Sequence, residues 1–304
     1  MLDKLFNKLS SRRDDKYIEI KNTPKKYVII GASAAGINAG KVLRKLDPNS
    51  NITIISKDNK IYSRCMLHHI ISNHRSVDSI NFVDVDFMDK NNIIWIKNTI
   101  AKSIDTKNKV VNLEDESIKY DKLLIATGAK SFIPPIKNIK EGNNIYSLRD
   151  IEDVFYIKEK IKKSKKVAII GAGLIGIDVL TSLLEINNLE VSLIYPNDYI
   201  LDLQLDEYSA KIYERKFIER GAKLYSSLPV NQIILDDNKN VKGVELGDNS
   251  IVKCDLLIVA TGVRPNTEIL RNTDIEENRG IVINNKCETS AKEIYAAGDV
   301  VGKN

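Results

Sequence analysis

The sequence predicts an α/β protein with two Rossmann-like dinucleotide-binding domains, the second inserted in the first. The main observation is a repeated pair of signatures. A glycine-rich turn at 28–36 (VIIGASAAG) is followed downstream by an ATG turn at 123–129, and a second glycine-rich turn at 167–176 (VAIIGAGLIG) by another at 257–266. Each glycine-rich turn follows a β-branched run and precedes a helical pattern, the context that makes this motif specific. The last segments of the chain have no counterpart in the second copy, which indicates a return to the first domain.

The glycine-rich turns are suited to holding phosphate groups. A strand that turns sharply into a helix presents unpaired backbone N–H groups and the positive end of the helix dipole, and only small residues let a pyrophosphate approach that backbone. The second copy has the complete G-x-G-x-x-G pattern over Gly171–Gly176, whereas in the first copy Ser33 takes the middle place between Gly31 and Gly36. We therefore expect a less close, or slightly rotated, backbone approach in the first copy.

The first copy predicts a strand–helix–strand unit, with a strand from Tyr27, a helix to about Leu46 and a strand over Asn51–Ser56. A loop and a short helix near Ile61–Ser72 follow. Three short alternating segments then resemble a small β-meander, at Ile93–Lys97, Ala101–Asp105 and Val110–Leu113. The strand before Thr127-Gly128 ends the copy, and the proline-containing stretch Ser131–Asn144 is the best candidate for a linker.

The second copy repeats this plan. Its predicted elements are a strand over Lys166–Gly171, a helix over Leu174–Leu184, a strand over Glu190–Tyr195, a helix from about Leu205 to Arg220, a meander over Ala222–Val252 and a strand over Leu256–Thr261. Ile281–Ile283 and Thr289–Val300 have no partner in this copy. We divide the chain into an N-terminal extension (1–26), a first dinucleotide-binding domain (27–144 and 255–304) and an inserted second one (145–254).

Composition and charge exclude several function classes. The 304 residues are 43% hydrophobic and 29% charged, which is ordinary for a soluble globular protein. No apolar run approaches the length of a membrane span and the first residues lack the apolar segment of a signal peptide, so we expect a cytoplasmic protein. A net charge of +5 is too small to favour a nucleic-acid partner. The three cysteines, Cys65, Cys254 and Cys287, form no C-x-x-C pair, so we expect neither a dithiol centre nor a metal site.

From Tyr27 to Val300 the chain resembles the FAD-dependent pyridine nucleotide oxidoreductases. The two glycine-rich turns, the two ATG turns and the segment TSAKEIYAAGD (289–299) stand in that family's order. The resemblance implies that the first domain holds FAD, that the second holds NADH or NADPH, and that Asp299 accepts a hydrogen bond from the flavin ribityl chain. The cofactor-binding residues that it implies are Gly31, Ser33, Ala35, Gly36, Ser56, Lys57, Arg64, Ala101, Thr127, Gly128, Arg149, Gly298, Asp299, Gly171, Gly173, Leu174, Ile175, Gly176, Asp178, Tyr195 and Gly262.

The stretch Ile61–Ser72 (IYSRCMLHHIIS) contains the candidate catalytic residues. It resembles the Y-x-R-x-x-L-S segment of rubredoxin reductases, ferredoxin reductases and nitrite reductase flavin domains, in which the arginine, here Arg64, lies against FAD. His69 stands where ferredoxin reductases carry a lysine, so it is either a proton-exchanging group beside the flavin or a structural histidine. Cys65 is either the redox cysteine of the NADH oxidase/peroxidase and coenzyme A disulfide reductase branch or a packed small side chain, because it comes one residue earlier than that branch's pattern.

The ribose contacts depart from the family pattern. Ser56 ends the second strand where the family has an acid that binds the FAD ribose. Tyr195 takes the matching place in the second domain, although Asp178 keeps an acidic position after the glycine motif. Because no arginine or lysine follows Tyr195 closely, we expect a preference for NADH over NADPH.

The resemblance implies a flavin-dependent oxidoreductase that passes hydride from NAD(P)H to FAD and electrons on to an acceptor such as rubredoxin, ferredoxin or oxygen. The partner is then a small electron-carrier protein or a small-molecule acceptor. The basic run Lys158–Lys166 would either steer an acidic carrier or form a solvated helix face. Family members continue past the position of Asn304 with an interface domain. An alternative hypothesis is therefore a truncated, non-catalytic nucleotide-binding module completed by a partner subunit.

Overall fold

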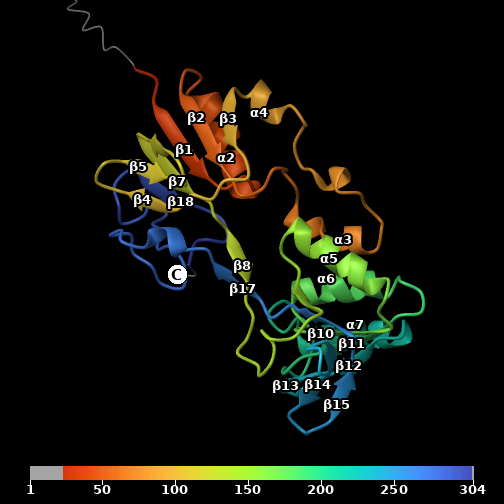
Figure 1. Cartoon of the computed structure of the whole chain (residues 1–304). Helices are drawn as coiled ribbons and strands as arrows, with labels where there is room; N and C mark the ends of the chain where they lie inside the picture. Colours follow the sequence, from red (N-terminus) through yellow and green to blue (C-terminus); the bar gives the residue numbers. More distant parts are fainter. Residues whose placement is uncertain (1–22, 303–304) are drawn as a thin grey trace, which may run out of the picture.

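Two five-stranded parallel sheets form the centres of two units (Figure 1). The computed structural model describes residues 23–302. The sheet of the first unit has the order β18-β7-β1-β2-β3, and that of the second unit has the order β12-β11-β10-β16-β9. The strands of the first sheet are β1 (Lys26–Ile30), β2 (Asn51–Ile55), β3 (Ile93–Ile96), β7 (Lys122–Ile125) and β18 (Ile294–Ala296); those of the second are β9 (Ile145–Ser147), β10 (Lys166–Ile170), β11 (Glu190–Ile194), β12 (Lys223–Tyr225) and β16 (Leu256–Val259).

The first sheet is buried on both faces, as parallel sheets usually are. Successive residues of β1 point to opposite faces, so Ile29 packs on α2 (Ala34–Leu46) and α4 (Phe87–Lys90). Val28 packs instead on a small antiparallel sheet made of β4 (Ser103–Asp105), β5 (Val110–Asn112) and β6 (Ser117–Lys119). This arrangement leaves the carboxyl end of β1 to run directly into the first glycine-rich turn.

The second unit repeats the arrangement. Ile169 of β10 packs on α5 (Ile151–Ile161), α6 (Leu174–Leu183) and α7 (Glu207–Glu219). Ala168 packs on a second antiparallel sheet made of β13 (Val230–Leu235), β14 (Val241–Leu246) and β15 (Ile251–Lys253). Each unit therefore has one helical layer and one meander on opposite faces of its parallel sheet.

Two strands were placed wrongly by the sequence patterns. Ile93–Lys97 was expected in the first meander, but β3 pairs parallel with β2, with Ile54 opposite Trp95. Ala222–Val252 was expected to be all meander, but its first strand, β12, pairs parallel with β11. In both units the three-stranded meander begins only afterwards. A short apolar run fits a buried parallel strand as well as an antiparallel one, so periodicity alone could not decide.

The crossing back to the first unit also lies later than residue 255, where we expected it. β16 pairs with β10 on one side and with β9 on the other, so Leu256–Val259 belongs to the second sheet. The two connecting segments instead pair with each other as β8 (Ala129–Ser131) and β17 (Val263–Pro265), which lie between the units in Figure 1. After η3 (Glu268–Leu270), the chain returns to the first sheet at β18, which pairs parallel with β7.

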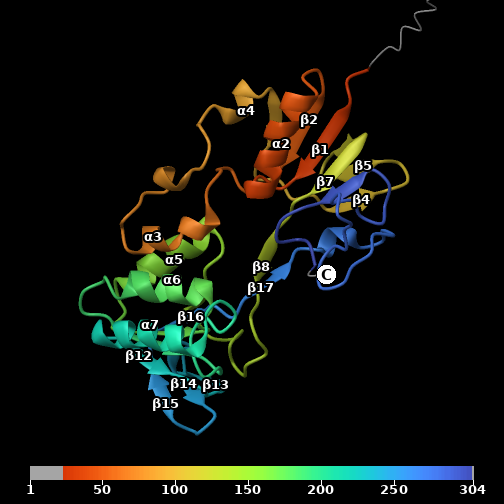
Figure 2. The ribbon, with the colours of Figure 1, turned by 180° about the vertical axis from the view of Figure 1, so that it is seen from behind.

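A third connection is made by residues 61–80, which leave the first unit and rest on the second (Figure 2). This excursion contains η1 (Arg64–Met66), α3 (His68–Ile71) and η2 (Asp78–Ile80). Its buried apolar side chains Tyr62, Leu67 and Ile70 belong to the same core cluster as α5 and α6. The segment that carries the candidate catalytic residues is thus anchored on the second unit.

Of the predicted N-terminal extension, residues 1–22 lie outside the described residues, and Lys26 already begins β1. Among the described residues, no helix is long and apolar enough to cross a membrane.

Candidate active site

A cavity of about 830 Å³ opens along the carboxyl ends of the strands of the first sheet. Ligands of doubly wound α/β folds bind at this edge. The predicted residues that line the cavity are Gly31, Ser33, Ala35, Ser56, Lys57, Arg64, Cys65, Ala101, Thr127, Gly128, Arg149, Gly298 and Asp299. They come from segments far apart in the sequence, and the fold brings them together.

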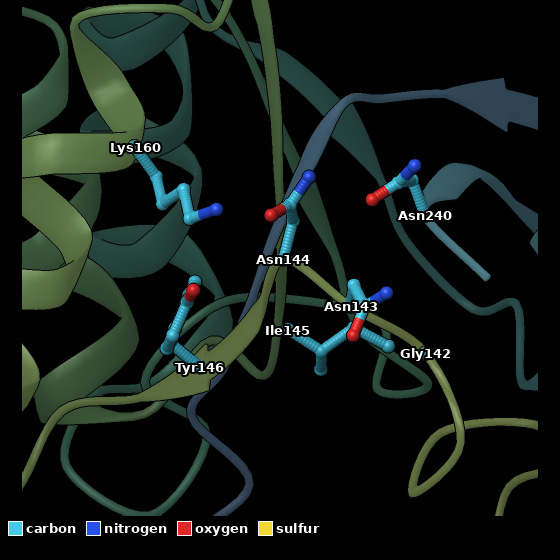
Figure 3. Close-up of a pocket in the computed structure, with 7 residues that line it drawn as sticks. All are labelled: Gly142, Asn143, Asn144, Ile145, Tyr146, Lys160 and Asn240. Carbon is cyan, nitrogen blue, oxygen red and sulfur yellow. The ribbon is translucent and has the colours of Figure 1, made fainter. Parts of the chain in front are cut away.

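A smaller hollow of about 380 Å³ lies on the second unit and shares no lining residue with this cavity. Figure 3 shows Lys160 and Tyr146 on one side of it and three asparagines, Asn143, Asn144 and Asn240, on the other. None of the predicted site residues lines this hollow, so the larger cavity is the candidate site.

The first glycine-rich turn forms one wall of the larger cavity. Gly31 has a φ of +119°, and a Cβ there would lie 2.1 Å from the carbonyl oxygen of Ala126, so only glycine fits. A Cβ on Gly36 would lie 1.9 Å from the Gly31 oxygen, which shows that Gly36 serves close packing of α2 on the turn. Ser33 is the N-cap of α2, and its side chain makes no capping hydrogen bond. No side chain of the cap residue occupies the first N–H groups of α2, which begin at this wall of the cavity. They are therefore available to an anion, as a phosphate site requires.

The second glycine-rich turn has a similar backbone conformation to the first, and one of its glycines, Gly173, has free space in front of it. Gly171 has a φ of +107°, and a Cβ there would lie 2.4 Å from the Ala260 oxygen. Gly176 again packs on Gly171, at 1.9 Å from Cβ to oxygen. At Gly173 an added Cβ meets nothing within 4 Å. The space in front of Gly173, at the start of α6 beside Leu174 and Ile175, is where a pyrophosphate can reach the backbone.

Arg149 and Asp299 form an ion pair across the larger cavity. The Arg149 guanidinium lies 2.7 Å from Asp299 Oδ2, and its Nε donates to the Ala129 carbonyl at 2.9 Å. The Asp299 side chain is 57% exposed, so its carboxylate stays open to a hydroxyl of a bound molecule. Asp299 follows Gly298, whose φ of +81° turns the chain at the end of β18.

A second set of charges surrounds Arg64. Its guanidinium pairs with Asp58 at 2.7 Å and with Asp150 at 3.1 Å, and Lys57 Nζ lies 2.5 Å from Asp150. Burial acts to raise the pKa of the Asp150 carboxyl, but the hydrogen bonds and charges of Lys57 and Arg64 outweigh it and hold that pKa below its usual range. Sequence patterns identified Lys57 and Arg64 but missed Asp58 and Asp150, although Asp150 is the N-cap of α5, a place that an aspartate before a helical pattern indicates.

The Ser56 hydroxyl is already committed within the protein. It donates to the Asp58 carbonyl at 2.7 Å and accepts from Trp95 Nε1 at 3.1 Å. Ser56 therefore supports the wall of the cavity. It does not replace the acidic ribose contact that the family has at this position.

The two candidate catalytic side chains are separated. Cys65 is exposed and lines the larger cavity. His69 is not among the residues that line it, and its place beside the flavin stays a prediction. Its ring lies 4.0 Å from that of His68 and 6.2 Å from that of His74, on the side of α3 near the second unit. The reason is tertiary: the excursion docks α3 on α6, where the Ser182 hydroxyl donates to the His68 carbonyl at 2.9 Å.

Asp178 and Tyr195 of the second unit, which were predicted to bind the nucleotide, contact other side chains of the protein. Asp178 on α6 pairs with His68 Nδ1 at 3.6 Å, so it faces the excursion. Burial raises the pKa of the Asp178 carboxyl and lowers that of the His68 imidazole. Tyr195 is 2% exposed, and its hydroxyl donates to Glu214 at 2.9 Å. Its side chain is therefore held inside the second unit, and a role of Tyr195 in binding the nucleotide stays a prediction. Gly262, with a φ of +103°, turns the chain after β16 as predicted for an ATG turn.

Among the described residues, no group of three or more histidine, cysteine, aspartate or glutamate side chains could hold a metal ion.

Comparisons with known proteins agree on one family. The family model described as pyridine nucleotide-disulphide oxidoreductase matches residues 25–304. The NADH-rubredoxin oxidoreductase of Clostridium acetobutylicum is 36% identical over 92% of this chain and 69% of its own length. The nitrite reductase [NAD(P)H] of Bacillus subtilis is 30% identical over 90% of this chain, but only 34% of its own length is covered. The crystal structure of the NADH:rubredoxin oxidoreductase from Clostridium acetobutylicum matches with a TM-score of 0.74 and 32% identity, over 91% of this chain and 68% of that one.

Proposed function

This chain belongs to the pyridine nucleotide-disulphide oxidoreductase family, and we propose that it passes electrons from NADH through FAD to a small electron-carrier protein. It is an oxidoreductase by family, with FAD and a nicotinamide nucleotide as cofactors. The observation that carries the proposal is the larger cavity, which gathers the first glycine-rich turn, Arg64, Arg149 and Asp299 around one space.

The residues of the cavity fit FAD. The free N–H groups at the start of α2 and the small residues Gly31 and Ala35 suit its pyrophosphate. Asp299 offers an exposed carboxylate to the ribityl hydroxyls, and Arg149 holds that carboxylate in place. When bound, the flavin accepts two electrons from a reduced nicotinamide and can release them one at a time, and the protein contributes binding and orientation.

The second glycine-rich turn fits the nicotinamide nucleotide, with Gly173 open to the pyrophosphate. NADH is favoured over NADPH because the loop after β11, Pro196–Gln204, contains Asp198 and Asp202 and no arginine or lysine. A 2′-phosphate needs a cation at this place, and Lys211 of α7, which reaches the loop, already donates to the Asp198 carbonyl at 2.9 Å. The two carboxylates would repel the phosphate. The relatives named for NADH agree with this preference.

The names of the relatives favour a one-electron protein as the acceptor. The relatives include a rubredoxin-NAD(+) reductase of Alcanivorax borkumensis, 29% identical over 90% of this chain, and a nitric oxide reductase FlRd-NAD(+) reductase of Aliivibrio fischeri. We therefore infer a rubredoxin-like partner. The basic run Lys158–Lys166 lies at the far end of α5 from Asp150, and part of it is occupied internally, since Lys158 Nζ donates to the Ile70 carbonyl at 2.9 Å.

Flavin content and NADH reduction test the proposal. The purified protein should be yellow, and anaerobic NADH should remove the absorbance of oxidised flavin, with NADPH at least tenfold less efficient. Reoxidation should be faster with rubredoxin than with air. A colourless protein that binds no added FAD would refute the proposal and favour the non-catalytic module.

A second candidate function uses Cys65, because its exposed thiol lines the same cavity as the FAD-binding residues. In this alternative the flavin electrons pass to a disulfide or sulfenic acid at Cys65, as in a single-cysteine reductase or peroxidase. Replacing Cys65 with serine distinguishes the two functions. Electron transfer to rubredoxin should persist in that variant, whereas thiol chemistry should be lost.

A further inference from the structure

Glu214 is a buried carboxylate on α7 that no sequence pattern identified. Its side chain is 9% exposed. One oxygen accepts from the Tyr195 hydroxyl at 2.9 Å and from the Ile200 backbone N–H at 3.1 Å, and the other lies 2.9 Å from Lys211 Nζ. A buried charge is costly unless it is paired and hydrogen-bonded, and here three donors satisfy it.

The groups that donate to Glu214 belong to one loop, directly precede it or bind to it. We call residues 196–201, which follow β11, the β11 loop. Glu214 holds this loop by the Ile200 N–H, and Lys211 holds it by donating to the Asp198 carbonyl at 2.9 Å. The pair of charges on α7 therefore fixes both a backbone donor and a backbone acceptor of the β11 loop. Tyr195, immediately before the loop, is fixed by its hydroxyl.

The β11 loop is in turn bonded to the second glycine-rich turn. The Leu201 N–H donates to the Ala172 carbonyl at 2.9 Å, and Leu201 has a φ of +53°, a left-handed conformation that the surrounding contacts must maintain. Ala172 lies between Gly171 and Gly173. Two hydrogen bonds, from the successive backbone N–H groups of Ile200 and Leu201, thus connect the buried carboxylate with the second glycine-rich turn.

The position of these bonds points to the nucleotide. β10 and β11 are parallel neighbours, with Ile170 opposite Ile194, so the glycine-rich turn and the β11 loop leave the same edge of the sheet side by side. A nucleotide bound at that edge has its pyrophosphate on the glycine turn and its ribose by the loop after the second strand. Tyr195 stands where the family carries the acid for that ribose, and it points inward to Glu214.

We propose that Glu214 is a positioning residue for the nicotinamide nucleotide, acting through Tyr195, Lys211 and the β11 loop. The proposal rests on the proposed function, because it takes the second glycine-rich turn as the NADH site. Glu214 fixes the loop before the nucleotide arrives, so that ordering the loop costs no binding free energy.

The variant Glu214→Gln tests this role. Glutamine has nearly the volume of glutamate but no negative charge to attract Lys211. Its NH₂ group also replaces one acceptor oxygen, so one of the donors that now bind the carboxylate would lose its hydrogen bond. We expect the KM for NADH to rise about tenfold, the factor that corresponds to about 1.4 kcal/mol. The kcat at saturating NADH should stay within about twofold and FAD content should be unchanged, because binding and not the reacting geometry is altered. Glu219→Gln is the control, since Glu219 on the same helix is exposed and pairs with exposed Lys216.

A second pair of variants tests the same role without replacing a buried residue. Lys211→Met takes away the exposed half of the pair, with its bond to Asp198, and should raise the KM for NADH about threefold. Lys216→Met, one to two turns further along α7, is the matched control and should change nothing. If Glu214→Gln does not fold, the Lys211→Met result decides.

An unchanged KM in folded Glu214→Gln, or in Lys211→Met, overturns the proposal. Loss of FAD together with NADH affinity also overturns it, because Glu214 would then support the whole protein and not the nucleotide loop. Failure of the proposed function is a different result: the flavin of the wild type would itself not be reduced by NADH.

Discussion

Replacing Gly173 with valine separates the glycine that faces the nucleotide from the glycines that maintain the fold. The Cβ position at Gly173 is open to 4 Å, and its φ of −77° suits any residue. Substituting glycine at a compatible backbone restricts the unfolded chain and stabilises by about 0.4–1 kcal/mol, while an N-cap glycine lost to an apolar residue costs a similar amount. The net change in the free energy of unfolding should stay within about 1 kcal/mol.

The effect on NADH should be much larger. A valine side chain would occupy the space that lets a pyrophosphate reach the backbone N–H groups at the start of α6. Hydrogen bonds to a charged group contribute about 1.5–3 kcal/mol each, so the loss of one or two weakens NADH binding, from about tenfold for one weak bond to about 20,000-fold for two strong ones. At Gly171, by contrast, a side chain combines a φ of +107° with a 2.4 Å overlap on the Ala260 oxygen. Strain and overpacking there together cost about 2–6 kcal/mol, a large part of a typical stability of about 5–15 kcal/mol.

The assay compares NADH with dithionite on the same flavin. Gly173→Val should be purified with FAD at the wild-type ratio, should melt near the wild-type temperature and should be bleached by dithionite but not by NADH at concentrations that reduce the wild type. Gly171→Val should be poorly folded. If Gly173→Val loses FAD and keeps NADH affinity, the two glycine-rich turns have been assigned to the wrong cofactors. If it reduces normally, the pyrophosphate does not approach Gly173.

Other substitutions test the larger cavity. Asp299→Ala should lower FAD retention at least tenfold in dialysis, whereas Asp178→Ala, whose carboxylate faces His68, should leave it unchanged; equal FAD contents would contradict the role of Asp299. His69→Ala should not change FAD affinity, because its ring lies outside the cavity, and a loss measured by flavin fluorescence would restore the original hypothesis. Asp150→Asn should destabilise the protein by about 1–3 kcal/mol at neutral pH. Because its folded pKa is depressed, this contribution is present above the unfolded pKa of about 3.9 and is lost as pH falls through the folded pKa, so urea unfolding of wild type and variant should converge in acid.

The sequence predicted the parts of the fold that depend on local chemistry. Gly31 and Gly171 need backbone conformations that only glycine adopts readily, so their turns, and the strand and helix on either side, could be identified from the residues alone. The edge strands β3 and β12 could not, because strands of four and three residues are too short for their pattern to reveal which sheet they join.

The site shows the same division. The backbone elements of the larger cavity followed from the motifs, whereas the directions of individual side chains did not. Tyr195 directly follows β11 at the edge where we propose that the nucleotide binds, yet its side chain points inward because Glu214 of α7 supplies a buried acceptor. His69 follows the cavity-lining Arg64 closely, yet the docking of α3 on α6 turns it away. In both cases the partner that decides the orientation comes from a distant segment, which no local pattern contains.

The charges that line the larger cavity come from both units. Arg149 and Asp150 are consecutive residues at the start of α5, a helix that packs in the core of the second unit. Arg149 pairs with Asp299 and Asp150 pairs with Lys57 and Arg64, and all three of these partners belong to segments that leave the first sheet. Two neighbouring side chains of opposite sign thus hold two walls of one cavity. An ion pair loses energy as its two charges separate, so the cavity keeps this set of contacts only while the start of α5 stays beside the segments that carry Lys57, Arg64 and Asp299. The proposed FAD site and the relative placement of the two units are therefore not independent features of this chain.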